Sequence, residues 1–355
     1  MTRELTIDGR RIADDTDCYV IAEIGHNHQG DLDKARQLFQ RARECGVDAV
    51  KLQKRDNRSL YTADMYNRPY EHENSFGRTY GEHREFLEFG QREYAELQQY
   101  ARELGLTFFS TAFDIPSADF LAALDVPAYK LASGDLRNLP LLRHVARLGK
   151  PMIISSGGAS LEEVERAYDA ITPINSAVSI LQCTASYPTE PEHMNLRVIE
   201  TFRQRFPSAV IGLSDHYNGI AMAGVAYMLG ARIIEKHFTL NHTWKGTDHA
   251  LSLEPIGMQK MIRDLHRARV ALGDGVKRSL PIESSALMKM GKKIVAARRL
   301  PAGHLLRDED LAIKSPGDGL PPTALDRVIG SRLMIALDAD EAISLEVLDA
   351  AGVKA

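Results

Sequence analysis

Several features that would assign this 355-residue chain to a special class of protein are missing from its sequence. It has only three cysteines, and Cys18, Cys45 and Cys183 show no metal-ligand spacing and lie in or beside apolar runs. This pattern is typical of small core residues in a reducing cytoplasm. No apolar run is long enough to span a membrane, and the polar, acidic residues 1–17 do not resemble a signal peptide. We therefore expect a cytoplasmic protein.

A clear excess of charge of one sign is also missing. The chain has 44 lysines and arginines against 48 aspartates and glutamates, which gives a net charge of -4. Proteins that bind nucleic acids or anionic membrane surfaces usually carry a basic excess, so we expect neither kind of partner. A chain of this length can bury a full core and has room for a large domain and a small one.

What the sequence does contain is a regular alternation of β-rich runs and helical stretches. Near-continuous apolar runs that alternate with helices indicate a parallel sheet, and eight such units indicate a closed (β/α)8 TIM barrel. The competing fold, an open doubly wound sheet, lacks support because no G-x-G-x-x-G turn follows the first run. The predicted strands are Tyr19–Ile24, Ala49–Gln53, Thr107–Ala112, Ala128–Ser133, Met152–Ser155, Val178–Thr184, Val210–Ser214 and Ile233–Thr239.

Turn and cap residues mark the boundaries of several elements. Leu32–Cys45 has an apolar face of helical period, with Asp31 placed to cap its start and Gly46 to end it. Residues 160–163 have the form of a capping box for a later helix. We expect a barrel domain over residues 1–272, of which 1–17 form a leader hairpin, then a linker at 273–291. A second, compact β-rich domain is expected over 292–355.

Two features of the sequence point to a functional site: one long connecting segment and the polar residues at the carboxyl ends of the strands. The long, polar and aromatic segment from Arg55 to Tyr94 is predicted to be a lid or substrate wall, although it may be decoration only. In a TIM barrel the working residues lie at the carboxyl ends of the strands. Those ends supply Glu23, Lys51, Gln53, Thr111, Lys130, Ser133, Asp135, Ser155, Ser156, Gly157, Tyr187, Ser214, Asp215, His216, Glu235 and His237.

These residue types suggest a metal site beside an anion site. His216 and His237 end successive strands, and two imidazoles at one rim can bind a divalent metal, unless each is only a hydrogen-bonded histidine. Lys51 and Lys130, with several hydroxyls and a glycine turn, suit a phosphate or carboxylate. Their alternative role is an ion pair with Glu23 or Glu235. Glu23, which has no obvious arginine on the opposite side of the rim, could orient hydroxyls or move a proton.

The sequence motifs resemble those of the sialic acid synthase family over nearly the whole chain. From residue 292 the chain resembles the family's antifreeze-like (SAF) domain. The matching motifs are I-A-E-I-G-H-N-H-Q-G-D-L, V-K-L-Q-K, R-P-Y, T-Y-G-E-H, P-A-Y-K-L-A-S-G-D, K-P-M-I-I-S-S-G, L-Q-C-T-A-S-Y-P, G-L-S-D-H, E-K-H-F-T-L and W-K-G-T-D-H-A-L-S-L-E-P.

The resemblance implies condensation of phosphoenolpyruvate with open-chain N-acetylmannosamine, or its 6-phosphate, to give N-acetylneuraminate, or its 9-phosphate, and inorganic phosphate. It implies that His216 and His237 hold Mn2+ or Mg2+, that Glu23 acts in catalysis with them, and that the SAF domain covers the partner's barrel in a domain-swapped homodimer. The implied phosphoenolpyruvate-binding residues are Lys51, Thr111, Lys130, Ser133, Ser155 and Ser214. The implied sugar-binding residues are Gln53, Asn74, Asp135, Tyr187 and Asp248.

One departure from the family pattern leaves the acceptor sugar open. Family members often have an arginine where this chain has Ser315, and Lys314 lacks the planar guanidinium fork of that arginine. A phosphorylated sugar, a deaminated one, or a precursor of pseudaminate or legionaminate therefore stays possible. Two rival functions are a metal-free Schiff-base aldolase that uses Lys51 or Lys130, and a non-catalytic sugar-binding barrel.

Overall fold

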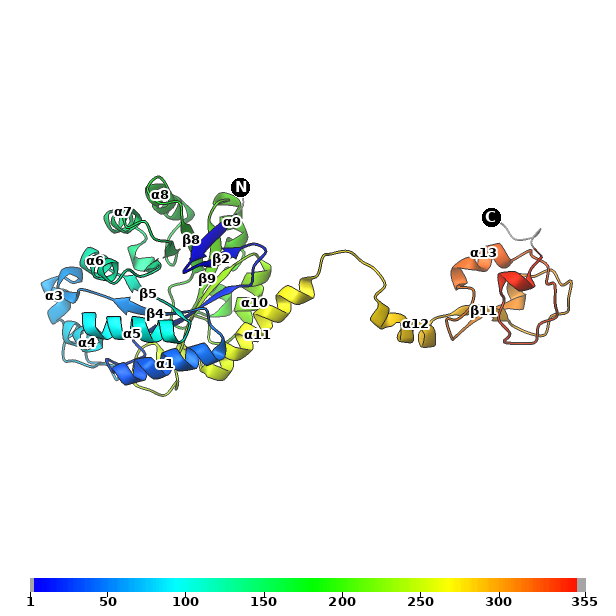
Figure 1. Cartoon of the computed structure of the whole chain (residues 1–355), viewed down its shortest axis with the longest axis horizontal. Coiled ribbons are helices and arrows are strands. Elements are labelled where there is room, and N and C mark those ends of the chain that lie inside the picture. The colour runs from blue at the N-terminus through cyan, green and yellow to red at the C-terminus, as the bar shows by residue number, and fades with distance from the viewer. Residues whose placement is uncertain (1–2, 350–355) are drawn as a thin grey trace. The chain divides into compact units, whose positions relative to one another are not determined.

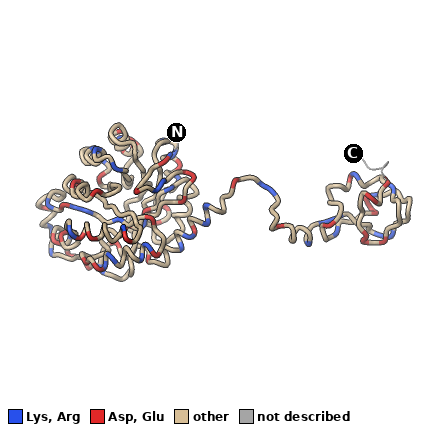
Figure 2. The backbone as a smooth tube through the Cα atoms, in the orientation of Figure 1, with Lys and Arg blue, Asp and Glu red and all other residues tan. Residues whose placement is uncertain are grey.

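The computed structural model describes residues 3–349, so the first two residues of the predicted leader and residues 350–355 of the predicted SAF domain lie outside it. The chain divides into two compact units, Met1–Gly273 and Asp274–Ala355 (Figure 1). Each unit has its own hydrophobic core. Figure 2 shows basic and acidic residues interspersed along the backbone of both units. Among the described residues, no helix is long and apolar enough to cross a membrane.

The first unit contains a closed barrel of eight parallel strands, which confirms the predicted fold. The strands follow one another around the barrel in chain order, and the last pairs with the first to close it. They are β3 (Tyr19–Gly25), β4 (Ala49–Lys54), β5 (Thr107–Ala112), β6 (Tyr129–Leu131), β7 (Met152–Ser155), β8 (Val178–Cys183), β9 (Val210–Asp215) and β10 (Ile233–His237). The fourth strand is shorter than predicted because the chain turns into a 3-10 helix at Ser133–Asp135.

At least one helix follows each strand of the barrel along the chain. These helices are α1 (Leu32–Cys45), α2 (Asn57–Leu60), α3 (Ala63–Asn67), α4 (Tyr80–Leu87), α5 (Gln91–Glu103), α6 (Ile115–Ala123), α7 (Leu139–Arg147), α8 (Leu161–Ile171), α9 (Val198–Arg205), α10 (Ala221–Met228) and α11 (Pro255–Leu272). The predicted boundary signals are present: the Asp31 carboxylate accepts the Lys34 amide at 3.0 Å, Gly46 adopts a φ of 87°, and residues 160–163 form a capping box.

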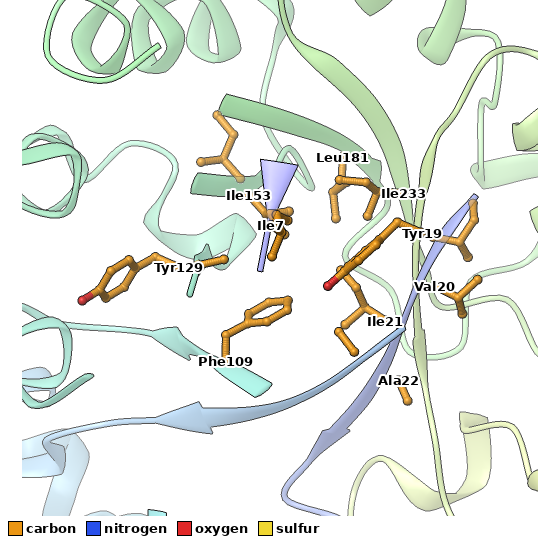
Figure 3. Close-up of a cluster of buried hydrophobic side chains, with 14 of the residues drawn as sticks. Ile7, Tyr19, Val20, Ile21, Ala22, Phe109, Tyr129, Ile153, Leu181 and Ile233 are labelled. Atoms are coloured by element: carbon orange, nitrogen blue, oxygen red, sulfur yellow. The ribbon is translucent and has the colours of Figure 1, made fainter. Parts of the chain in front are cut away.

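The leader forms the predicted hairpin, with β1 (Glu4–Ile7) paired antiparallel to β2 (Arg10–Ala13). The Asp8 carboxylate at its tip accepts a hydrogen bond from Thr107, the first residue of β5, at 3.2 Å. Ile7 lies in the same buried cluster as Tyr19, the first residue of β3, and Phe109 (Figure 3). The hairpin therefore packs against the amino ends of the strands and leaves their carboxyl ends for a site.

The second unit is a small β-rich fold after a short connecting segment. That segment carries a 3-10 helix at Pro281–Glu283 and α12 (Ser284–Met290). Beyond it, β11 (Lys293–Ala296) pairs antiparallel to β12 (Leu311–Lys314), and α13 spans Leu325–Val328. Isolated bridges join further extended segments around a core that includes Ile294, Ala296, Leu300, Leu306, Val328, Leu333 and Ile343.

The close packing of the barrel can be tested at Gly212 of β9. A Cβ atom there would lie 2.5 Å from Leu181 Cδ2 and 2.9 Å from Ile233 Cβ, atoms of the two neighbouring strands. We expect Gly212→Ala to lower the free energy of unfolding by about 2–3 kcal/mol through overpacking, as measured by urea denaturation. Gly224→Ala in α10 is the matched control, because a Cβ atom there meets nothing within 4 Å. This variant should raise the free energy of unfolding by about 0.5–1 kcal/mol, since alanine favours the helix more than glycine does. Equal stability of the two variants would contradict the tight strand packing.

Candidate active site

A cavity of about 580 Å³ lies at the carboxyl ends of the strands. Its wall includes all but one of the catalytic, metal-binding and substrate-binding residues that the family resemblance implies. They are Glu23, Lys51, Gln53, Asn74, Thr111, Lys130, Ser133, Ser155, Tyr187, Ser214, His216, His237 and Asp248. Ser156, Gly157 and Asp215 from the predicted strand ends do not line it. Asp135 is not among the lining residues: it lies half-buried in the 3-10 helix after β6, and burial raises its pKa to about 6.

The strand register explains why these residues converge. Glu23 pairs in register with His237 on one side and with Lys51 on the other, and Thr111 pairs with Lys130. Side chains alternate between the two faces of a strand, so every second residue near a carboxyl end points into the cavity. Because the strands are parallel and end at one rim, residues far apart in the chain share one wall.

The same alternation turns Asp215 and Lys236 away from the cavity. They form a fully buried ion pair on the outer face of the barrel, with 2.9 Å between Lys236 Nζ and Asp215 Oδ2. Asp215, one of the residues at the predicted strand ends, therefore does not line the cavity. The carboxylate of Asp215 compensates the positive charge of Lys236. Burial lowers the pKa of this lysine.

Removal of this carboxylate should destabilise the barrel. We expect Asp215→Asn to lower the free energy of unfolding by about 3–5 kcal/mol, because Lys236 would stay buried without a compensating charge. Thermal unfolding followed by circular dichroism measures the loss, and Asp215→Leu combined with Lys236→Met should restore much of it. Asp264→Asn, at an exposed pair, is the control and should leave the midpoint almost unchanged. An unaltered midpoint for Asp215→Asn would show that the pair is energetically neutral.

The two predicted metal ligands lie together, with 5.5 Å between the ring centroids of His216 and His237. His216 Nδ1 lies 2.9 Å from the carbonyl oxygen of Thr184, so Nδ1 carries the hydrogen and the lone pair of Nε2 is free. His237 Nδ1 is buried without a hydrogen-bond partner, and Asp248 Oδ2 lies 3.7 Å from it. Burial lowers the pKa of His237, which favours the neutral form that binds metals.

Two imidazoles fit a divalent metal whose other ligands are water or substrate oxygens. Among the described residues, no group of three or more histidine, cysteine, aspartate or glutamate side chains has the geometry of a metal site. The protein would therefore supply the two imidazoles, and water or substrate oxygens would complete the shell, as is common for Mn2+ and Mg2+.

Lysines and carboxylates are paired at the floor of the cavity. Lys51 forms an ion pair with Glu23, donates to Thr111 Oγ1 at 2.7 Å and lies 3.8 Å from Glu235 Oε2. Lys130 lies 3.9 Å from Glu235 Oε1. Burial and the charge of Glu235 raise the pKa of Glu23, against the opposing effect of Lys51. Ion pairing with Glu23 or Glu235 was the predicted alternative to anion binding for these two lysines. The ion pairs are present in the site, so the two lysines share two acidic partners.

Hydroxyl and backbone groups surround these charges. Ser155 Oγ is buried without a hydrogen-bond partner, Ser214 donates to Glu235 at 3.1 Å, and Ser133 Oγ accepts the Gly157 amide at 3.0 Å. The unpartnered Ser155 hydroxyl is available to an incoming ligand, because a buried polar group normally has a partner. Tyr187 closes another part of the wall, with its ring 4.1 Å from that of His216.

Sequence reasoning missed two arginines that line the cavity, Arg55 and Arg84. One signal was available: Lys51, Gln53 and Arg55 stand at every second position, so they share one face of β4 and its continuation. The segment from Arg55 to Tyr94 also supplies His72 and Asn74 to the wall. Cys183, expected only in the core, lines the cavity and lies 3.4 Å from Ser133 Oγ.

Comparisons with known proteins give a consistent picture. The NeuB family matches residues 38–277, and the SAF domain matches residues 293–348. The chain is similar to N-acetylneuraminate-9-phosphate synthase of Homo sapiens, with 40% identity over 98% of this chain and 97% of the human protein. It is also similar to N,N'-diacetyllegionaminic acid synthase of Legionella pneumophila, with 34% identity over 94% of this chain and 95% of the relative.

A solved structure agrees with these sequence relatives. The crystal structure of N-acetylneuraminic acid (sialic acid) synthetase from Leptospira borgpetersenii, in complex with citrate, superposes with a TM-score of 0.70. It shares 31% sequence identity, and the similarity covers 81% of this chain and 95% of the other. Sequence and fold thus point to the same group of proteins.

Proposed function

This chain belongs to the NeuB family of enzymes, and on that premise we propose that it is a sialic acid synthase. It condenses phosphoenolpyruvate with open-chain N-acetylmannosamine, or its 6-phosphate, and releases inorganic phosphate. The product is N-acetylneuraminate, or its 9-phosphate. The observation that carries this proposal is one cavity in which two histidines face a group of buried lysines and hydroxyls.

The lysines and hydroxyls at the floor would bind phosphoenolpyruvate. Lys51 and Lys130 offer positive charge, and the free Ser155 hydroxyl offers a hydrogen bond to an anionic oxygen. The remaining residues of this group are Thr111, Ser133 and Ser214. Glu23 and Glu235 hold the lysines in place before the substrate binds, which lowers the cost of ordering them.

The reaction balances as an addition followed by loss of phosphate. The methylene carbon of phosphoenolpyruvate uses the electron pair of its double bond to form a bond to the aldehyde carbon, and the aldehyde oxygen takes up a proton. Water then adds at the electron-deficient C2 and loses a proton. The bond between C2 and the phosphate oxygen breaks, and its electron pair leaves with the phosphate. The new C2 hydroxyl loses its proton, and the electron pair of that O–H bond completes the C2 carbonyl. The product is a 2-keto acid.

Each part of the wall then has a role in this step. A divalent cation such as Mn2+ or Mg2+, held by His216 and His237, would polarise the sugar aldehyde. Glu23 can hold or move a proton at its carboxylate, because its raised pKa brings it closer to neutral pH. Four of the five sugar-binding candidates line the cavity, namely Gln53, Asn74, Tyr187 and Asp248, whereas Asp135 does not.

A related nonulosonate synthase is the second candidate. The similarity to the Legionella enzyme and the serine at position 315 both favour it. In the second unit, Lys314 already forms an ion pair with Asp340, and Ser315 accepts a hydrogen bond from Lys292 at 2.7 Å. Lys314 is thus occupied and does not offer a free replacement for an arginine at this position.

The proposal includes the assembly and the cell compartment. A homodimer in which the SAF domain of one subunit covers the barrel of the other would follow the resemblance described above. The three cysteines are free and buried, which is consistent with a reducing cytoplasm. The mass in solution, measured by light scattering, tests the dimer.

Phosphate release tests the proposed reaction directly. Purified protein with Mn2+ and phosphoenolpyruvate is given a panel of 2-acetamido hexoses and their 6-phosphates, and inorganic phosphate is measured. We expect release with at least one manno-configured acceptor, abolished by a chelator and restored by metal. No release with any acceptor would refute the synthase proposal. Borohydride trapping of a keto acid on a lysine would instead support a Schiff-base aldolase.

A further inference from the structure

Two guanidinium groups meet at the cavity wall without a carboxylate partner. Arg55 directly follows β4 and Arg84 belongs to α4, and the NH1 groups of both contact the same imidazole of His26, at 3.3 Å and 3.4 Å. Within residues 3–349, neither guanidinium has a carboxylate oxygen within 4.0 Å. Asp248 is an acid that lines the same cavity. Glu88, outside the lining, is held by Lys54 at 3.1 Å and lies 3.6 Å from His26.

The arginines have more donors than the protein can satisfy. Each guanidinium has five N–H donors and no acceptor. Arg55 donates to Gln53 Oε1 at 2.7 Å, and Arg84 donates to the Tyr80 hydroxyl at 2.9 and 3.1 Å. Burial lowers the pKa of His26 well below its usual value, and a neutral imidazole accepts at only one of its two nitrogens. At least one of the two NH1 contacts is therefore not a hydrogen bond.

The position of Arg55 is fixed from two sides. Its guanidinium lies 3.7 Å from the ring centroid of Phe113, and Gln53 bridges it to Glu23, whose Oε1 accepts from Gln53 Nε2 at 2.6 Å. One amide group between two hydrogen bonds places the guanidinium within roughly 8 Å of the Glu23 carboxylate. An open six-carbon chain spans roughly 6–7 Å, so an acceptor whose aldehyde lies near Glu23 can reach Arg55 with its far end.

We infer that Arg55 and Arg84 form a subsite for a phosphate monoester at the far end of the acceptor, so that the acceptor is a 6-phosphorylated 2-acetamido hexose. This inference rests on the function proposed above, which leaves the acceptor open between the free sugar and its phosphate. Arginine forks bind phosphate oxygens in pairs, and a dianion would neutralise both side chains at once. The phosphate of phosphoenolpyruvate is a separate group, which we place beside Lys51 and Lys130.

Acceptor preference is the measurement that tests this subsite. With Mn2+ and saturating phosphoenolpyruvate, we expect kcat/KM for N-acetylmannosamine 6-phosphate to exceed that for N-acetylmannosamine by about a hundredfold. Arg84→Met should reduce this ratio by about tenfold to a hundredfold, and Arg84→Lys by less, because lysine keeps the charge and loses the fork. Arg55→Met should act in the same direction. The KM for phosphoenolpyruvate should stay within about twofold in each variant.

Controls separate the subsite from a folding defect and from the proposed reaction. Arg78→Met removes an exposed arginine of the same segment that does not line the cavity, and it should leave the ratio unchanged. Arg84 is only half-buried, so its variants test the subsite even if Arg55→Met fails to fold. A wild-type enzyme that uses the free sugar equally well would overturn the inference, as would arginine variants that raise only the KM for phosphoenolpyruvate.

Calorimetric titration keeps the two proposals distinguishable. If no phosphate is released with either acceptor, the sugar and its 6-phosphate are titrated separately into the protein with Mn2+ present. Tighter binding of the 6-phosphate, weakened by Arg84→Met, would uphold the subsite while the proposed reaction fails. Equal binding of both sugars, or binding of neither, would overturn the subsite as well.

Discussion

Replacement of His237 by alanine should lower kcat by about a thousandfold or more while the barrel stays folded. The side chain is buried, and its Nδ1 atom has no hydrogen-bond partner in the protein. Its loss therefore breaks no hydrogen bond at that atom and removes one of the two imidazoles proposed to hold the metal. Phosphate release measures the activity, and thermal unfolding measures the stability of the same preparation.

Metal binding provides the second measurement on this variant. We expect Mn2+ titration, followed by electron paramagnetic resonance, to show a bound ion in the wild type and none in His237→Ala at the same concentration. His242→Ala is the control, because His242 is exposed on the loop after β10 and does not line the cavity. If the His237 variant is inactive only because it unfolds, or if it binds Mn2+ as tightly as the wild type, the assignment of His237 as a ligand is wrong.

The second large effect is expected at Glu23, where Glu23→Gln should reduce kcat by about a hundredfold to ten thousandfold. Glutamine keeps the shape and can still accept the hydrogen bond from Gln53, but it can neither carry the negative charge nor hold an extra proton. Lys51 would retain Glu235 at 3.8 Å, so the floor of the cavity keeps one counter-charge for it. The loss should therefore appear in kcat more than in the KM for phosphoenolpyruvate.

The conservative variant and a stability measurement discriminate between the two roles of Glu23. Glu23→Asp keeps the charge on a shorter side chain and should recover part of the activity lost in Glu23→Gln. If Glu23 served only as the partner of Lys51, Glu23→Gln would lower the unfolding midpoint and retain more than about a tenth of the wild-type kcat. That result would remove Glu23 from the catalytic group.

The alternation of elements and the residues at the strand ends were sufficient to predict the barrel and most of its cavity wall. Along a parallel strand, the period of two decides which side chains point inward, and Glu23 and Lys51 both follow it. The prediction weakened where a strand ends. Asp135 belongs to a 3-10 turn, whose direction the strand period does not determine, and it does not line the cavity.

Other parts of the site depend on tertiary contacts that no local pattern records. Arg84 belongs to a helix inside a long connecting segment, and only the folded path of that segment brings it to His26 beside Arg55. The pairing of Asp215 with Lys236 depends on which face of β9 and β10 each side chain takes. A one-residue error in the assumed register would have exchanged these outward residues with the inward histidines.

The placement of Lys51, Gln53 and Arg55 at alternate positions of β4 and the residue that directly follows it sets the dimensions of the binding site. Each step of two residues spans roughly 6.6 Å, and the backbone hydrogen bonds of the barrel hold that spacing rigid. Mutation at these positions can therefore change which chemical groups are recognised, but not how far apart they are. Selection for a longer or shorter acceptor would have to remodel the segment from Arg55 to Tyr94, where insertions do not disturb the barrel.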